Sequence, residues 1–357
     1  MSHSSPVRTL LITAGSTHRE PWWWNFVDHE AQPCLLEHQT VIVENGRLSR
    51  LLSFETAALL WRVVSILFSG RRRYYAVYTF ECGWLSFAIA FIQTITFYHR
   101  PRHVILQFIM REKRPTWQSR LKYVFMRFCF SSVYLCVCSS RAECSYYAKV
   151  FGWPASKLAY IPLHTDPRLL EHETSDGDFV LAAGRTLRDY PTLIEAFKTI
   201  DTPLVIVAGK ASADLAASAN VLFRFDIPGP ELIDLMARSF AVALPLEERE
   251  ISTGQSVLLQ AMTLGKPVIA THVNGTADYI DHMETGILVP PRDPQAFREA
   301  VQLLAGDAAL RERLGKAARA RVEAEFLPRH YAQAVAQAMA LTAEQRGGRP
   351  STEAARA

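Results

Sequence analysis

The chain has 357 residues, 49% of them hydrophobic and 21% charged, which is typical of a soluble globular protein and excludes a single small core. The net charge of +4 conceals two opposite halves. Residues 1–164 carry 19 basic and 9 acidic side chains, whereas residues 165–357 carry 20 basic and 26 acidic side chains. All seven tryptophans lie in the basic first half. This asymmetry predicts two units that meet different partners.

The first half contains apolar runs that suit buried parallel strands. They are TLLITAG (9–15), YYAVYTF (74–80), HVILQFI (103–109), YLCVCSS (134–140) and KLAYIPL (157–163). Two other apolar stretches, 84–98 and 123–138, are too short to span a membrane, and Arg127 interrupts the second. We expect both to be buried helices. MSHSSPV lacks the basic start and apolar core of a secretory signal, so we expect a cytoplasmic protein.

The six cysteines form no Cys-x-x-Cys pair, and no histidine lies near the four that cluster between residues 129 and 144. This spacing does not suit a metal site, so we expect no metal. Free thiols in a reducing cytosol explain the cysteines better.

Strands and helices alternate in the second half. The predicted strands are DFVLAAG (178–184), TPLVIVAG (202–209), AVALPL (241–246), KPVIAT (266–271) and GILVPP (286–291). The predicted helices are PTLIEAFKTI (191–200), ELIDLMARSF (231–240), SVLLQAMTLG (256–265), PQAFREAVQLLAG (294–306) and AALRERLGKAARARVEAEF (308–326). This alternation predicts a parallel sheet with helices on both faces.

The acidic stretch HTDPRLLEHETSDGD (164–178) marks the predicted domain boundary. We therefore predict an α/β protein with two Rossmann-like, doubly wound domains, residues 1–164 and 165–343, followed by a disordered tail, 344–357. Ligands of such sheets bind at the carboxyl ends of the strands, so both domains are expected to face one cleft.

Four motifs follow one another in the second half. They are GRTLRDYPTLIEAF (184–197), FDIPGPELIDLMARSFAVALPL (225–246), STGQSVLLQAMTLGKPVIAT (252–271) and NGTADYIDHMETGILVPPRDPQAF (274–297). Their order and spacing resemble the nucleotide-sugar domain of GT-B glycosyltransferases and are most similar to the large retaining family 4. In the first half, the resemblance rests on the domain order, on the segment VCSSRAECSYYAKVFGWPASKLAYIPL (137–163) and on Asp166, which follows it.

The first motif supplies the residues that the resemblance assigns to catalysis, Arg185 and Arg188, with Gly184 beside them. A nucleoside diphosphate gains negative charge as it leaves, and fixed cations lower that barrier. Two guanidinium groups just past a strand end are suited to clamping the diphosphate. The alternative is that both are surface arginines at a helix entry.

The polar segment Ser252, Thr253, Gly254, Gln255, Ser256 precedes a predicted helix that has no carboxylate in its first turn. Because the N-terminus of a helix favours negative charge, we expect these residues to cradle the donor phosphate, with glycine allowing close approach. An ordinary N-cap by Ser252 or Thr253 is the other interpretation. By resemblance, Asp226, Ile227 and Gln260 also bind the donor, as does Gly15 from the first half.

The sequence departs from the family in two places. The family usually has glutamates at the positions of Ser252 and Gln260. Gln260 retains an amide for a ribose hydroxyl, but Ser252 supplies no charge, and Glu250 is a possible substitute. Many relatives carry a histidine where HVILQFI ends in Gln107 and Phe108. We therefore assign no base, and by resemblance the departing phosphate takes the acceptor proton; Glu81 and Gln107 are the acceptor-side candidates.

Basic and aromatic residues concentrate in the first half, at WWW (22–24), RRRYYAVY (71–78) and 100–127, which holds eight basic residues and one acid. This composition suits an anionic membrane surface or a polyprenyl-phosphate acceptor; a solvated basic face is the alternative. No nucleic-acid motif accompanies the charge, so no nucleic-acid partner is predicted.

The predicted function is transfer of a sugar from a nucleotide-sugar co-substrate to a glycan or polyprenyl-linked acceptor, retaining and metal-independent by resemblance. No other cofactor is expected. Two alternatives remain. One is a nucleotide-sugar 2-epimerase or a phosphorylase on the same fold, and the other is a non-catalytic partner of a glycosyltransferase.

Overall fold

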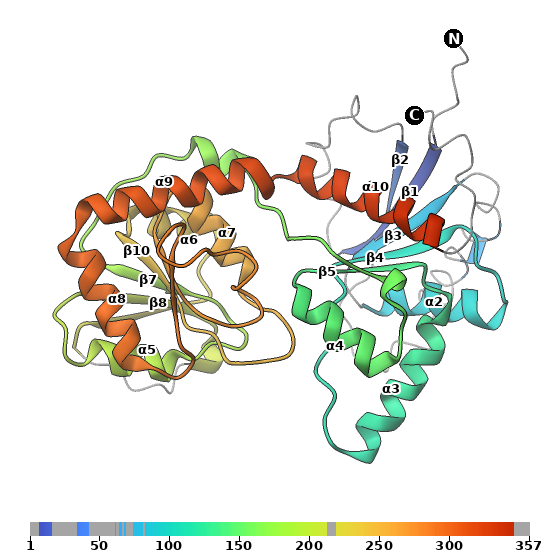
Figure 1. Cartoon of the computed structure of the whole chain (residues 1–357), viewed down its shortest axis with the longest axis horizontal. Helices are drawn as coiled ribbons and strands as arrows, with labels where there is room; N and C mark the ends of the chain where they lie inside the picture. The colour runs from blue at the N-terminus through green and yellow to red at the C-terminus, as the bar shows by residue number, and fades with distance from the viewer. Residues whose placement is uncertain are drawn as a thin grey trace, which may run out of the picture. The chain divides into compact units, whose positions relative to one another are not determined.

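The computed structural model describes residues 7–15, 34–42, 61, 64, 65, 68, 74–80, 83–212 and 219–345. The chain divides into two compact units (Figure 1). Unit 1 comprises residues 1–161 and 332–357, and unit 2 comprises residues 162–331. The boundary predicted at 164/165 is close to the first division, whereas residues from 332 onward, which the sequence assigned to the second domain up to 343, group with unit 1.

Unit 1 contains a six-stranded sheet in which every neighbouring pair is parallel, with the order β2-β1-β3-β4-β5-β6. The strands are β1 (Val7–Gly15), β2 (Cys34–Ile42), β3 (Ala76–Phe80), β4 (Arg102–Leu106), β5 (Leu135–Cys138) and β6 (Leu158–Tyr160). The helices are α2 (Trp84–Ile95), α3 (Trp117–Cys129), α4 (Arg141–Phe151) and α10 (Pro328–Gln345), which begins in unit 2.

Helix α4 shows how local sequence sets an element's ends. The Ser140 hydroxyl accepts the backbone N–H of Glu143 at 3.1 Å, and the buried Glu143 carboxylate accepts the N–H of Ser139 at 3.1 Å. This reciprocal arrangement fixes the start of the helix. Gly152, at φ 61°, ends it in the left-handed conformation.

The expectation of two buried helices in unit 1 is half right. Helix α2 buries seven of its twelve residues, as predicted for 84–98. The stretch 123–138 is instead divided between the end of α3, a short 3-10 turn at Phe130–Ser132 and strand β5. Helix α3 buries only Tyr123 and Cys129, because its other apolar side chains point away from the core. The cysteines at 129, 136, 138 and 144 are free thiols.

Unit 2 contains a second parallel sheet of six strands, ordered β12-β11-β10-β7-β8-β9. The strands are β7 (Val180–Ala183), β8 (Leu204–Ala208), β9 (Val221–Phe225), β10 (Ala241–Leu244), β11 (Val268–Thr271) and β12 (Ile287–Val289). The helices are α5 (Tyr190–Phe197), α6 (Gly229–Arg238), α7 (Gln255–Thr263), α8 (Pro294–Gly306) and α9 (Ala308–Glu325). The strand order reverses between β7 and β10, which is where doubly wound sheets bind ligands.

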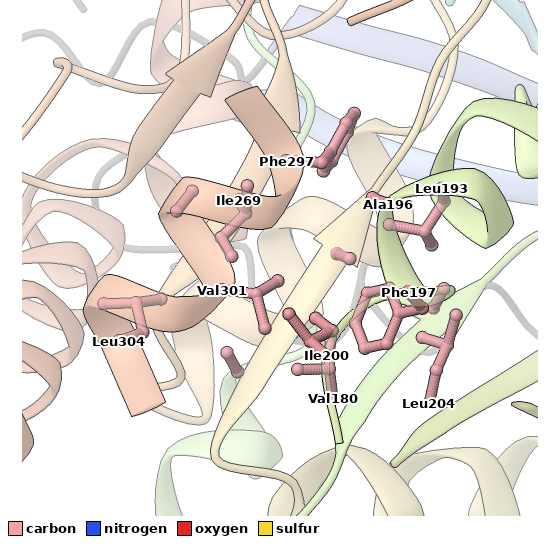
Figure 2. Packing of buried hydrophobic residues seen from close by; sticks show 14 of the residues in the cluster. Val180, Leu193, Ala196, Phe197, Ile200, Leu204, Ile269, Phe297, Val301 and Leu304 are labelled. Carbon is pink, nitrogen blue, oxygen red and sulfur yellow. The ribbon is translucent and has the colours of Figure 1, made fainter. Parts of the chain in front are cut away.

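Alternate side chains of β7 divide the core of unit 2 into two layers. Val180 packs with Phe197 of α5 and Val301 of α8 (Figure 2), and Ala182 belongs to the same cluster. Leu181 and Ala183 face the opposite cluster, formed with side chains of α6, α7 and α9. The sheet is thus covered on both faces, and this explains why its strands are continuous apolar runs.

The predicted strands and helices of unit 2 are all present, and its fold class is confirmed. Among the described strands and α-helices, β2, β9, α4 and α10 were not predicted, and α3 was predicted only from residue 123 onward. The two strands lie at the edges of their sheets. Edge strands have one strand neighbour instead of two, and both carry polar residues that interrupt the apolar pattern.

Candidate functional site

The donor-side residues predicted in unit 2 gather at one edge of its sheet, beyond the carboxyl ends of the strands. Gly184 and Arg185 follow β7, Asp226 follows β9, and the segment 245–254 connects β10 to α7. Backbone hydrogen bonds join the first and last of these loops. Asp189 N–H donates to Pro245 O at 3.1 Å, and Glu247 N–H donates to Leu187 O at 3.2 Å. The two loops therefore meet at the switch point of the sheet.

Arg185 presents an exposed cation at this edge. Its side chain is 68% exposed, and Nε lies 3.6 Å from the Asp226 Oδ1. Gly209, after β8, lies beside the aliphatic part of the same side chain, since an added Cβ there would come within 3.5 Å of Arg185 Cγ. An exposed pair at this distance contributes little to stability, so the guanidinium remains available to an anionic ligand.

Arg188 turns back toward the protein rather than into solvent. Its Nε donates to Ala183 O at 3.0 Å, and Nη1 donates to Thr186 O at 2.8 Å. Burial lowers the pKa of the guanidinium from its usual value, and Tyr190 partly opposes that shift. Among the residues that the structure describes, Arg188 pairs with no carboxylate. The predicted clamp of two arginines is thus arranged as one exposed cation and one that holds the loop.

Gly184 is required by the shape of this loop. Its φ is 138°, and an added Cβ would overlap the Arg188 guanidinium. The Tyr190 hydroxyl donates to Gly184 O at 2.6 Å, and burial raises the pKa of Tyr190 to about 12. Tyr190 was not predicted to be a site residue, although it lies within the first motif. Its position at the start of a helix that follows the glycine turn was the available signal.

Helix α7 begins at Gln255, one residue earlier than predicted. Its N-cap is Gly254 at φ 92°, which has no side chain to cap the first turn, and no acid lies in that turn. Neither Ser252 nor Thr253 is the cap, so the ordinary N-cap interpretation does not describe this helix. Backbone N–H groups at a helix start without acidic side chains favour an anion.

The loop after β11 supports the segment that leads into α7. An added Cβ at Gly275 would lie 2.6 Å from Thr253 O, so the two backbones are in close contact. The Asn274 amide donates to Arg249 O at 2.9 Å. Ser252 and Gln255 are buried, whereas Ser256 is exposed. No role was predicted for Asn274 and Gly275, although an Asn-Gly pair is a turn signal.

The two positions that depart from the family differ in their surroundings. Ser252 is buried, and Gln260 is partly buried on α7. Glu247, in the same loop as the possible substitute Glu250, forms an ion pair with Arg249. The backbone carbonyl of Glu250 lies 3.5 Å from the Asn274 amide nitrogen.

Asp226 and Ile227 lie just past β9. Asp226 has φ 50°, and its backbone N–H donates to Ala208 O at 3.1 Å. Its side-chain carboxylate is exposed and lies near Arg185. Ile227 is half-buried against the apolar cluster of α6 and α7. Of these two residues, only Asp226 presents a polar side chain at the sheet edge.

The remaining candidates belong to unit 1. Gly15 ends β1, and Gln107 follows β4 with φ 55°, so both lie at the carboxyl edge of that sheet. Glu81 lies outside the described residues, as do WWW at 22–24 and Arg71 to Arg73. Within the described part of the chain, no group of three or more His, Cys, Asp or Glu side chains is arranged to hold a metal ion.

Comparisons with known proteins find similarity to glycosyltransferases. The family model described as "Glycosyl transferases group 1" matches residues 171–321. The chain is 36% identical over 142 residues to D-rhamnosyltransferase WbpZ of Pseudomonas aeruginosa, covering 38% of this chain and 37% of that protein. It is 28% identical over 167 residues to the capsular polysaccharide biosynthesis glycosyltransferase CapM of Staphylococcus aureus. This match covers 43% of this chain and 44% of that protein. The matches thus span less than half the length of these relatives.

The fold extends the likeness over nearly the whole chain. The structure of HepE from Anabaena in complex with UDP aligns with a TM-score of 0.65 and 18% identity, covering 93% of this chain and 99% of that one. At this identity the likeness concerns the fold alone. Residues 171–321 therefore match the glycosyl transferases group 1 family model, and the chain shares the fold of two parallel sheets with the HepE structure.

Proposed function

We propose that the protein transfers a sugar from a nucleotide-sugar donor to a glycan or polyprenyl-linked acceptor in cell-surface polysaccharide or glycolipid synthesis. The family model, the glycosyltransferase names of the relatives and the UDP complex of the similar HepE fold support this proposal. The transfer is retaining and needs no metal ion or cofactor other than the donor co-substrate. It takes place at the cytosolic face of a membrane.

The observation that carries the proposal is the pairing of Arg185 with the start of α7 at the switch point of the sheet. One supplies an exposed guanidinium, and the other supplies the backbone N–H groups of a helix start whose N-cap is a glycine and whose first turn holds no acid. Both are suited to the diphosphate of the donor, which becomes more negative as the glycosidic bond breaks. Groups that are already in place stabilise this charge without having to reorganise.

Arg188 is then a positioning residue. Its guanidinium fixes the backbone around Gly184 through two carbonyl oxygens, and this sets where Arg185 leaves the strand. Because an arginine side chain stays protonated in proteins, it also adds positive potential beneath the loop. The departing phosphate accepts the proton of the acceptor hydroxyl, so no side chain is assigned as a base.

The absence of carboxylates at Ser252 and Gln260 favours one alternative, a protein that binds the donor without turning it over. Isothermal titration calorimetry with UDP-, GDP-, ADP- and CMP-sugars, followed by a product assay with membrane lipid extract, separates the two functions. We expect one nucleotide-sugar to bind with saturation and to be consumed only when the extract is present. Binding without turnover supports the non-catalytic alternative, turnover without extract supports an epimerase, and no binding contradicts all three.

A further inference from the structure

Helix α3 presents an apolar stripe to solvent. Its side chains recur at the spacing of one helical face and are between 49% and 72% exposed: Trp117, Leu121, Val124, Phe125 and Phe128. We call these five residues the α3 stripe. The opposite face holds Tyr123 and Cys129, which are buried. Contiguous exposed apolar surface of this kind marks an interaction site in a folded protein.

Helix α2 extends this surface. Phe87 and Phe91 of α2 lie with their ring centroids 5.9 and 6.4 Å from that of Phe125, so the two helices are joined by aromatic contacts. At the end of α2, Ile95 is 49% exposed and Phe97 is 85% exposed. Figure 1 shows α3 at the periphery of unit 1, beside α2 and α4.

Cations flank the stripe without matching acids. Helix α3 carries Arg120, Lys122 and Arg127, all exposed, and contains no Asp or Glu. At about 100° per residue, Arg120 and Arg127 fall on one side of the stripe and Lys122 on the other. The preceding residues add Arg111, Lys113 and Arg114 against a single acid, Glu112.

We propose that the α3 stripe docks on an anionic lipid bilayer, with α3 lying in the plane of the interface. The apolar side chains enter the boundary between head groups and acyl chains, Trp117 occupies the depth that tryptophan favours, and the flanking cations contact anionic head groups. Among the described residues no helix is long and apolar enough to cross a bilayer, and interfacial docking does not require one.

The charge pattern selects a bilayer over a second copy of the chain. Two copies packed stripe to stripe would bring the cations of both helices together with no acid from α3 between them, which is unfavourable. An anionic surface meets the same cations with opposite charge. The docking proposal rests on the proposed function in one respect only: docking would bring the donor site close to a polyprenyl-linked acceptor in the bilayer.

The test is co-sedimentation of the full chain with vesicles of phosphatidylcholine containing about one third phosphatidylglycerol, at low and high salt. We expect the wild type to pellet with these vesicles, less so at high salt and much less with pure phosphatidylcholine. The variant Leu121→Ser/Val124→Ser/Phe128→Ser should lose binding at least tenfold. Leu222→Ser/Leu303→Ser, which changes two exposed apolar residues of unit 2, should bind like the wild type.

A second variant removes charges instead of apolar side chains, so docking can still be tested if the triple serine variant does not fold. Arg120→Gln/Lys122→Gln should weaken vesicle binding by about fivefold for each cation removed. Arg224→Gln/Lys316→Gln removes the same charge from unit 2 and should have little effect. Circular dichroism and thermal unfolding confirm that each variant is folded.

Three results would overturn the proposal. The first is wild type that stays in the supernatant with anionic vesicles at low salt. The second is pelleting of the stripe and charge variants to the same extent as their controls. The third result is a concentration-dependent dimer that the serine variant abolishes, which would assign the stripe to contacts between copies. Calorimetry with nucleotide-sugars on the same preparations separates the two proposals. Donor binding without vesicle binding refutes only docking, and vesicle binding without donor binding refutes only the function.

Discussion

Arg185 and Asp226 come from loops after different strands, β7 and β9, and meet at the sheet edge with Nε 3.6 Å from Oδ1. Strand β8 lies between those two strands, so the contact spans the width of one strand. Because both side chains are largely exposed, the pair is weak and can open for a ligand. A diphosphate would replace the carboxylate as the partner of the guanidinium.

Arg185→Gln should therefore cost about 2–4 kcal/mol in the transition state for transfer, which is a loss of roughly 30- to 1000-fold in kcat/KM. The free energy of unfolding should change by less than about 0.5 kcal/mol, since the side chain is exposed. Arg224→Gln, which removes another exposed arginine of unit 2, is the matched control. Unchanged kcat/KM in Arg185→Gln would remove this residue from the site.

Gly184→Ala should destabilise unit 2 by about 2 kcal/mol or more. The new methyl group meets the Arg188 guanidinium, and φ 138° is strained for any residue with a Cβ. Gly306→Ala is the control, because an added Cβ there contacts nothing within 4 Å. Urea unfolding of both variants gives the comparison. Equal stability of the two would mean that the Gly184 loop relaxes without cost.

Gln260→Glu should be tolerated and should bind the donor at least as well as the wild type. The amide makes no hydrogen bond to another described residue, and a carboxylate accepts two ribose hydroxyls. Calorimetric titration of the nucleotide-sugar measures the effect. A tenfold or greater loss of affinity would show that the amide N–H₂ of Gln260 donates to the ligand.

Stability should fall as the pH falls below about 6.5, the ordinary pKa of histidine. Burial, with a smaller effect of the Lys157 charge, lowers the pKa of His103 to about 3, and burial lowers the pKa of His164 to about 4. The unfolded chain binds these protons first, so the loss develops between pH 6.5 and pH 3–4.

His103 alone should cost about 2 kcal/mol at pH 5 relative to neutral pH. His103→Gln keeps a hydrogen-bonding group near Thr79 Oγ1, which lies 2.9 Å from His103 Nε2, and should make the pH dependence shallower. His99→Gln, at an exposed position, is the control. Equal slopes of unfolding free energy against pH in the two variants would contradict the assignment to His103.

The sequence by itself determined the two parallel sheets and most of their strands, because strands that are covered on both faces consist of uninterrupted runs of apolar residues. It missed β2 and β9, both at sheet edges, where polar residues such as Glu37 and Arg224 interrupt that pattern. It also identified the loop of Gly184 and Arg185, since a glycine and a cation directly after a buried strand must lie at the sheet edge.

Only the tertiary structure decided where individual side chains go. Arg185 and Arg188 are the same residue type three positions apart, yet one faces solvent and the other binds carbonyl oxygens of its own loop. The part of α3 that falls within 123–138 was expected to be buried, yet Val124, Phe125 and Phe128 are exposed. A sequence pattern records that a side chain is apolar or charged. Whether another element covers it, or offers it a partner, depends on how segments distant in the chain pack together.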